Sequence, residues 1–286
     1  MPDPNHAADP VRLRLALAVC RAAVGDTAEN IRRMRDFCAL AAKDHAGLIL
    51  FPELSLTGYQ LDPETANAMA EGSSGPLAEE VKAAARDFGL FVFAGFVEKK
   101  NEGRPFIAHA AAGPDGSFAL FRKLHLSPAE APVYCPGDEI GLTSVNGFSL
   151  GLAICYDTHF PELFTRLALA GADAVLCPFA SPRGTGQQKV ESLLRHLPAR
   201  AFDNGVFVAA TNQTGENESG LCFPGGALAI SPLGRVAAAD GSGREGLLFA
   251  DLCRDELSQV RGHRMRYFLP GRRKDLWDLP VRVPSS

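Results

Sequence analysis

The sequence lacks several features that would assign it to common functional classes. No apolar run approaches the roughly 20 residues that a membrane-spanning helix needs. No CxxC pair occurs among the seven cysteines, which argues against a zinc site and a thioredoxin-type redox motif. The net charge is −4 and no basic stripe dominates, which argues against nucleic acid as the main partner. Tyr267, Phe268 and Leu269 interrupt the densest basic run, residues 261–274, so we interpret it as a surface or interface tail.

The N-terminus and the cysteines together indicate a compartment. The first ten residues, MPDPNHAADP, contain neither an apolar segment nor an Arg-rich amphipathic pattern, so we expect no targeting segment. The cysteine count is odd, and several cysteines lie in apolar runs, where a buried free thiol behaves as a small hydrophobe. Free thiols fit a reducing compartment. We therefore expect a cytoplasmic protein whose partners include neither nucleic acid nor a membrane.

Length and composition predict one large domain. The chain has 286 residues, of which 46% are hydrophobic and 22% charged, close to the globular average. That is enough apolar material for a core that needs no disulfide or metal. No internal repeat or linker marks a second domain. We expect a flexible N-terminal segment at 1–11, the domain at 12–270, and an interface-forming C-terminal tail at 271–286.

Apolar patterns alternate between those of strands and those of helices. The expected strands are residues 12–22, 48–54, 90–99, 149–157, 172–180, 205–213 and 246–252. One helix is expected to begin after an N-cap at Asp26 or Thr27. Four further helices are expected at residues 77–88, 161–170, 187–203 and 255–262. Hairpins are expected at 106–123 and 225–240, with turns at 114–116 and 232–234. Because some connections are hairpins, the sheets should be mixed within a layered α/β domain.

Three polar residues stand at or just past the ends of apolar strands. Glu53 follows LILFP, Lys123 follows FALFR, and Cys155 follows GLAI. Binding crevices in α/β sheets form at such ends, so the three side chains could converge. Each also has a plainer interpretation: a solvated glutamate, an exposed lysine and an inert core cysteine.

A carboxylate, an ammonium and a thiol would together make a nucleophile site. A cysteine with a pKa near about 8.5 is only a few per cent ionised at neutral pH. A neighbouring carboxylate can take the thiol proton, and an ammonium can stabilise first the thiolate and then an oxyanion. The backbone N–H of Tyr156, just after the cysteine, can supply a second oxyanion donor.

The flanking residues resemble those of the nitrilase, or carbon–nitrogen hydrolase, superfamily. The motifs that carry the resemblance are FPEL and LTGY (51–54, 56–59), RKLHL with Glu130 and CPGD (122–126, 135–138), GLAICYD with FPE (151–157, 160–162), ARAFDN (199–204), and the hairpin at 225–234. They follow one another in the family's order from about residue 12 to about residue 280. The resemblance implies an α/β fold: a four-layer αββα sandwich with two mixed β-sheets covered by helices.

The resemblance also implies roles and a reaction for the carbon–nitrogen hydrolase domain at 12–270. Glu53 would be the general base, Lys123 the oxyanion-stabilising cation, Cys155 the nucleophile, and Glu130 a second glutamate beside the lysine. The substrate would form a thioester acyl-enzyme with loss of ammonia or an amine. The resemblance implies no metal and no organic cofactor. It implies that the chain forms a homodimer or a larger homo-oligomer.

Two segments depart from the family pattern: at His159 we expect a local change in packing or pairing, and in a later loop the departure concerns the substrate. His159 stands where CYDxRFPE has arginine, and the loop after the strand at 172–180 reads SPRGTGQQ in place of TGxxHW. Because that loop commonly lines the pocket, the substrate of any one relative does not transfer. The expected substrate-binding residues are Tyr59, Tyr134, Ala180, Ser181 and Arg183. Arg183 could meet a substrate carboxylate, or it could be an ordinary surface arginine.

The residue after the cysteine favours one branch of the family. Cysteine followed by Tyr156-Asp157 resembles amidases and carbamoylases, whereas nitrilases more often have tryptophan there. We therefore expect hydrolysis of an amide or N-carbamoyl bond of a small molecule. Nitrile hydrolysis and a non-catalytic or glutaminase-type partner subunit remain as alternatives.

Overall fold

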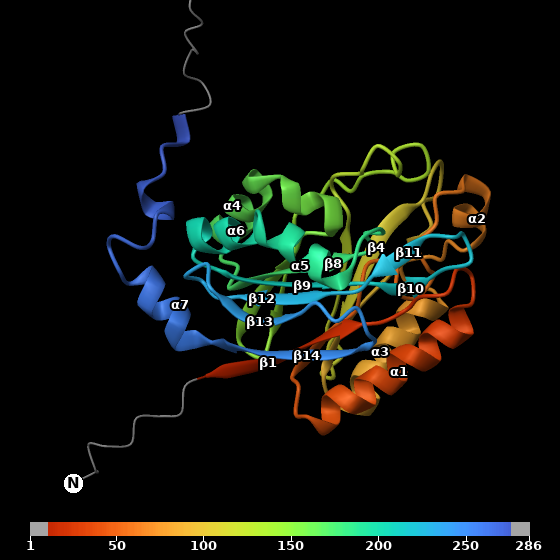
Figure 1. Cartoon of the computed structure of the whole chain (residues 1–286), viewed down its shortest axis with the longest axis horizontal. Coiled ribbons are helices and arrows are strands. Elements are labelled where there is room, and N and C mark those ends of the chain that lie inside the picture. Colours follow the sequence, from red (N-terminus) through yellow and green to blue (C-terminus); the bar gives the residue numbers. More distant parts are fainter. Residues whose placement is uncertain (1–10, 276–286) are drawn as a thin grey trace, which may run out of the picture.

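The fold is an αββα sandwich, as expected. A computed structural model describes residues 11–275. Two six-stranded mixed sheets pack face to face, and helices cover their outer faces (Figure 1). The N-terminal segment expected at 1–11 and the tail expected at 271–286 lie outside the described residues, apart from Val11 and residues 271–275. Within residues 11–275, no helix is long and apolar enough to cross a bilayer.

The first sheet has three central parallel strands with antiparallel strands on both sides. Its order is β14 (Gly246–Cys253), β1 (Arg12–Val19), β2 (Leu48–Leu50), β3 (Phe91–Glu98), β4 (Phe106–Ala112) and β5 (Phe118–Arg122). Helices α1 (Thr27–Lys43) and α3 (Pro76–Phe88) make the parallel crossovers, with the short α2 (Pro63–Ala68) before α3. Asp26 caps α1 by accepting from the N–H of Glu29 at 3.1 Å, as the sequence predicts.

The second sheet mirrors this plan. Its order is β13 (Val236–Asp240), β12 (Ala227–Ile230), β9 (Phe207–Asn212), β8 (Ala174–Phe179), β7 (Phe148–Leu152) and β6 (Leu142–Val145). Its outer face carries α4 (Pro161–Leu169), α5 (Gly186–Leu194) and α6 (Leu197–Asn204). The remaining elements are the β10 (Thr214–Glu216) and β11 (Cys222–Pro224) ribbon, α7 (Arg254–Arg261), and two 3₁₀ turns, η1 (Cys155–His159) and η2 (Leu269–Gly271).

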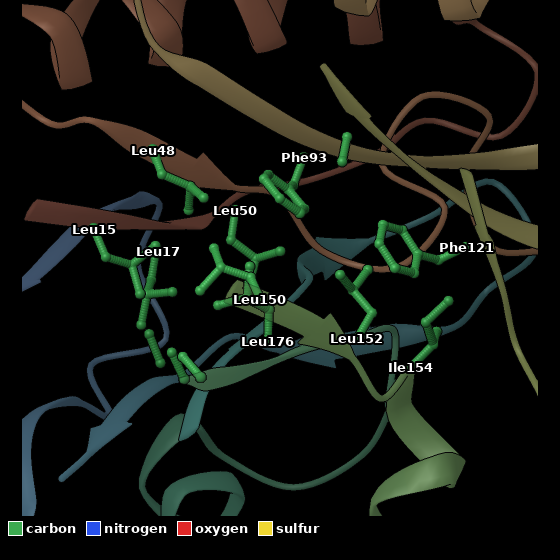
Figure 2. Packing of buried hydrophobic residues seen from close by; sticks show 14 of the residues in the cluster. Leu15, Leu17, Leu48, Leu50, Phe93, Phe121, Leu150, Leu152, Ile154 and Leu176 are labelled. Carbon is green, nitrogen blue, oxygen red and sulfur yellow. The ribbon is translucent and has the colours of Figure 1, made fainter. Parts of the chain in front are cut away.

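The core is divided between the space separating the sheets and the two helix-covered faces. In β1, Leu13, Leu15 and Leu17 face the other sheet, whereas Ala16 and Ala18 face α1 and α3. Figure 2 shows the large side chains that meet between the sheets. Burying each leucine stabilises the fold by roughly 1.5–3 kcal/mol, so this layer fixes the two sheets against each other.

Two expected elements differ in the structure. The single helix expected at 187–203 is wrong: α5 ends at Leu194 and α6 begins at Leu197. Pro198 has no N–H, and its ring would clash with the carbonyl of Leu194 in a continuous helix. The strand expected at 149–157 ends at Leu152, and Cys155 begins η1 instead.

Candidate active site

Three of the candidate residues, together with Glu130, form one buried cluster. Glu53 follows β2, Lys123 follows β5 directly, and Cys155 begins η1 after β7. The Nζ of Lys123 donates to the Oε1 of Glu53 and to the Oε1 of Glu130, both at 2.7 Å. The thiol of Cys155 lies close enough to Glu53 and Lys123 for both charges to act on its pKa. Cys155 and Glu130 also line a cavity of about 310 Å³.

Glu53 is held by backbone and side-chain contacts from both sheets. Its Oε2 accepts from the N–H of Ala180 at 2.9 Å, and its carbonyl oxygen accepts from the Nε2 of Gln213 at 2.7 Å. The next residue, Leu54, has a φ of +52° and lies against Gly95 of β3. A Cβ at Gly95 would come within 2.5 Å of the Leu54 nitrogen, so only glycine leaves room for the loop that presents Glu53.

Glu130 lies on the other side of the lysine. Its Oε1 also accepts from the hydroxyl of Tyr59 at 2.9 Å, and its Oε2 accepts from the N–H of Ser127 at 2.8 Å. Every described donor around this carboxylate therefore favours its ionised form. Burial alone would raise its pKa, but Lys123 and these hydrogen bonds bring the pKa of Glu130 below its usual value.

The turn at Cys155 has an uncommon backbone conformation. Cys155 has a φ of +48°, a left-handed value that costs energy in any residue with a side chain. The carboxylate of Asp157 holds the turn, since it accepts from the N–H of Ile154 at 3.0 Å and from that of His125 at 2.7 Å. The same carboxylate therefore ties the cysteine segment to the segment that carries Lys123.

The backbone N–H of Tyr156 lies at the start of η1, next to the cavity. The first hydrogen bond of η1 runs from the N–H of Asp157 to the carbonyl of Ile154 at 3.1 Å. The N–H of Tyr156 precedes that bond, so it has no acceptor within its own helix. Tyr156 lines the cavity together with Cys155.

The electrostatics of the cluster favour a neutral thiol at rest. Burial raises the pKa of Cys155, and the negative charge of Glu53 raises it further. Burial also raises the pKa of Glu53, and this outweighs the Lys123 charge, which acts to lower it. Burial alone would lower the pKa of Lys123, but Glu53, Cys155 and Glu130 outweigh it and raise this pKa. The cluster therefore holds a permanent ammonium beside a thiol and a carboxylate that can exchange one proton.

The cavity wall contains four of the five residues expected to bind substrate: Tyr59, Ala180, Ser181 and Arg183. Tyr134 does not line it, which corrects the expectation. Its side chain is fully buried, and its hydroxyl donates to the carbonyl of Gln60 at 2.8 Å. That hydrogen bond uses the only polar atom of the side chain, so Tyr134 supports the loop after Tyr59.

Sequence reasoning missed one face of α5 together with His196, which lies just beyond the end of that helix. Lys189, Ser192, Leu193 and His196 all line the cavity. They are spaced i, i+3, i+4 and i+7, the signal that could have identified one helical face. The helix begins at Gly186 and is capped by Thr185, whose hydroxyl accepts from the N–H of Gln188 at 3.3 Å. The capping glutamine returns the bond, so the start of α5 is firmly set.

His159, which stands in place of the family's arginine, packs against another histidine. Its ring stacks on that of His196 with centroids 5.0 Å apart. The Nε2 of His196 lies 3.2 Å from the hydroxyl of Thr158. Burial lowers the pKa of both imidazoles, to about 4 for His196. Both rings are therefore neutral at pH 7.

Comparison with known proteins identifies the family. The sequence profile described as carbon-nitrogen hydrolase matches residues 14–262. The chain belongs to the carbon-nitrogen hydrolase family. This carbon-nitrogen hydrolase is 33% identical over 212 residues to an (R)-stereoselective amidase of a Pseudomonas species, which covers 74% of this chain and 75% of the relative. It is 27% identical over 268 residues to the human omega-amidase NIT2, covering 90% and 94%.

Solved structures show the same fold. The carbon-nitrogen hydrolase superposes on the amidase from Nesterenkonia sp. AN1 in complex with acrylamide with a TM-score of 0.76. The two are 29% identical, and the match covers 88% of this chain and 95% of that one. The family and the sandwich fold expected from the sequence are both confirmed, and the chain is an enzyme that hydrolyses carbon–nitrogen bonds.

Proposed function

We propose that this carbon-nitrogen hydrolase cleaves the amide bond of a small molecule through a thioester on Cys155. The observation that carries the proposal is the Lys123 ammonium, which bridges the carboxylates of Glu53 and Glu130 next to Cys155, whose side chain lines a cavity. The relatives named above are amidases, which favours an amide over a nitrile. The cavity volume is near the lower end of the range typical of small-molecule sites.

Acylation begins with a proton transfer. Glu53 takes the thiol proton of Cys155, and the sulfur attacks the amide carbonyl carbon. The carbonyl oxygen gains the negative charge and accepts hydrogen bonds from Lys123 and from the N–H of Tyr156. Glu53 then returns the proton to the amide nitrogen as the carbon–nitrogen bond breaks. Ammonia or an amine leaves, and a thioester remains on Cys155.

Deacylation reverses the proton transfers with water as the nucleophile. Glu53 takes a proton from water, and the oxygen attacks the thioester carbon. The same two donors stabilise the second oxyanion. The carbon–sulfur bond breaks, the carboxylic acid leaves, and the proton held by Glu53 returns to the sulfur of Cys155. No atom beyond substrate and water is consumed.

Glu130 supports this cycle without touching the substrate carbonyl. It keeps Lys123 charged and fixes the direction of its ammonium. The hydroxyl of Tyr59 restrains Glu130 in turn. In a related case, a glutamate-to-glutamine variant of the Nesterenkonia amidase carries acrylamide added to its active-site cysteine, so that cysteine reacts with carbon electrophiles.

The test combines turnover with trapping. Purified enzyme is supplied with panels of amides, N-carbamoyl amino acids and nitriles, and ammonia release is measured. Rapid quenching followed by mass spectrometry then reports any acyl group on Cys155. We expect turnover of amides, an acyl adduct on Cys155, and no turnover by the Cys155→Ala variant. Turnover of nitriles or N-carbamoyl compounds alone would overturn the amide assignment. Full activity of Cys155→Ala would overturn the mechanism.

A further inference from the structure

Lys189 is a partly buried cation that no described carboxylate neutralises. It lies on α5 in the same cavity wall as Ser181 and on the same cavity as Cys155. Its Nζ donates to the Oγ of Ser181 at 2.6 Å. Among residues 11–275 it takes part in no ion pair, whereas the fully buried Lys123 has two. An ammonium has three donors, so two of those on Lys189 are available to a ligand.

The other charged groups around the cavity do not compensate Lys189. The only carboxylate in the lining, that of Glu130, is already bound by Lys123, Tyr59 and Ser127. Arg183 lies exposed in the same lining and forms no ion pair within the described part of the chain. Among the described residues between 180 and 196, those that line the cavity include Arg183 and Lys189 but no carboxylate, since Glu191 is exposed and not part of the lining.

The cost of this arrangement is visible in the lysine itself. Burial lowers the pKa of Lys189, and only a negative charge on Cys155, which is neutral at rest, would oppose that shift. A buried ammonium without a counter-ion is unfavourable unless a ligand supplies the charge. A negatively charged ligand group in the cavity would remove that penalty and accept charge-assisted hydrogen bonds from Lys189.

We propose that Lys189 binds a carboxylate of the substrate, so that this enzyme prefers amides that carry a carboxylate. The inference rests on the proposed amide hydrolysis at Cys155 and specifies its substrate class. The scissile carbonyl lies at the sulfur of Cys155 and the carboxylate at the Nζ of Lys189, so one small molecule spans both. Arg183, at the exposed side of the cavity, attracts the anion as it enters.

A structural role for Lys189 makes a different prediction. If the lysine only holds the loop through Ser181, its loss disturbs the pocket for charged and neutral substrates alike. If it binds a carboxylate, its loss affects charged substrates selectively. A matched pair of substrates that differs only in charge therefore separates the two roles.

The substrates are succinamate and its neutral methyl ester, and the enzymes are wild type, Lys189→Gln, Lys189→Arg and Lys43→Gln. Glutamine keeps a donor for Ser181, and Lys43→Gln removes one exposed charge from α1, on the opposite helix layer. We expect wild type to favour succinamate and Lys189→Gln to lower its kcat/KM about 10- to 100-fold, the value of a hydrogen bond to a charged group. The kcat/KM of Lys189→Gln for the methyl ester should change less than about threefold. Lys189→Arg should keep part of the preference for succinamate over the ester, and Lys43→Gln should keep all of it. Equal losses on both substrates, or no preference in wild type, would overturn the inference. A 3-phosphonopropionamide arm tests the anion, and a preference for it over succinamate would also overturn the assignment to a carboxylate.

A second measurement does not depend on turnover. Iodoacetate and iodoacetamide both alkylate thiols and differ in charge, and mass spectrometry reports the adduct on Cys155. The ratio of the iodoacetate rate to the iodoacetamide rate should fall in Lys189→Gln and stay unchanged in Lys43→Gln. If this ratio falls while no amide is hydrolysed, the proposed function fails and the anion site stands. If amides are hydrolysed and the ratio is unchanged, the anion site fails alone.

Discussion

Replacing Lys123 by methionine tests the central contact of the site. Methionine keeps much of the aliphatic length of lysine and removes the ammonium. The carboxylate oxygens of Glu53 and Glu130 both lie 2.7 Å from the lysine nitrogen, so they are at most twice that distance apart. Both side chains are buried, which leaves the two negative charges facing each other without a cation.

The size of the effect follows from the burial of the pair. Removing one partner of a buried ion pair destabilises a protein by about 3–5 kcal/mol, because the remaining charge stays desolvated. For a chain of this size, that loss lowers the melting temperature by roughly 5–8 °C. The proposed mechanism adds a second effect, since losing an oxyanion donor lowers kcat about 100- to 1000-fold.

Two further variants separate charge from packing. Lys123→Met/Glu130→Gln removes one of the two facing carboxylates, so it should regain about 1–2 kcal/mol over the single variant and remain inactive. Lys82→Met breaks the surface pair with Glu79, where Nζ and Oε1 are 2.8 Å apart, and should cost less than about 1 kcal/mol. Thermal and urea unfolding followed by circular dichroism measure stability, and ammonia release measures activity. A Lys123→Met enzyme that melts within about 2 °C of wild type would refute the reasoning about the buried charges.

Three other perturbations probe the surroundings of the site. Glu53→Gln removes the negative charge that raises the pKa of Cys155, so iodoacetamide should alkylate the thiol faster at pH 7 while amide turnover falls at least about 100-fold; slower alkylation would contradict the assigned direction. Gly95→Ala places a Cβ 2.5 Å from the Leu54 nitrogen, so urea unfolding should show a loss of about 1–3 kcal/mol and kcat should fall, with unchanged kcat as the contrary result. Burial lowers the pKa of His109 to about 3. Between about pH 6.5 and 3, the unfolded state therefore binds a proton that the folded state does not. The free energy of unfolding should decrease as the pH is lowered through this range, by up to about 1.4 kcal/mol per pH unit. A His109→Leu variant should show a shallower dependence in urea unfolding between pH 5 and 6.5, and an unchanged slope would count against this explanation.

Much of the fold could be predicted because its elements have clear local patterns. The helix after Asp26 has its cap and its apolar spacing within one segment, and the hairpins have their turn residues between two apolar runs. The three separate motifs around Glu53, Lys123 and Cys155 each end near a strand, so their convergence followed from the sheet geometry and the family resemblance. Local signals of this kind survive because neighbouring residues determine them.

The remaining features depend on contacts between segments that are distant in the sequence. The left-handed backbone at Cys155 is held by Asp157, which also binds the backbone of His125. Lys189 enters the cavity because α5 ends before Pro198 and packs over the second sheet. Tyr134 is buried because its hydroxyl meets a carbonyl 74 positions away. None of these contacts has a local pattern, so periodicity and capping signals could not predict them.

The division of the site between the two sheets explains why its geometry depends on the core. Glu53 and Lys123 follow strands of the first sheet, whereas Cys155 and Ala180 follow strands of the second. Figure 2 shows Phe121, two residues before Lys123, facing Ile154, the residue before Cys155, in the layer between the sheets. The hydrogen bond from the Ala180 N–H to Glu53 therefore crosses from one sheet to the other. In the proposed mechanism a proton passes between Glu53 and the sulfur of Cys155, and this transfer requires the two sheets to keep their spacing. The apolar side chains between the sheets therefore set the distance on which the proposed chemistry depends.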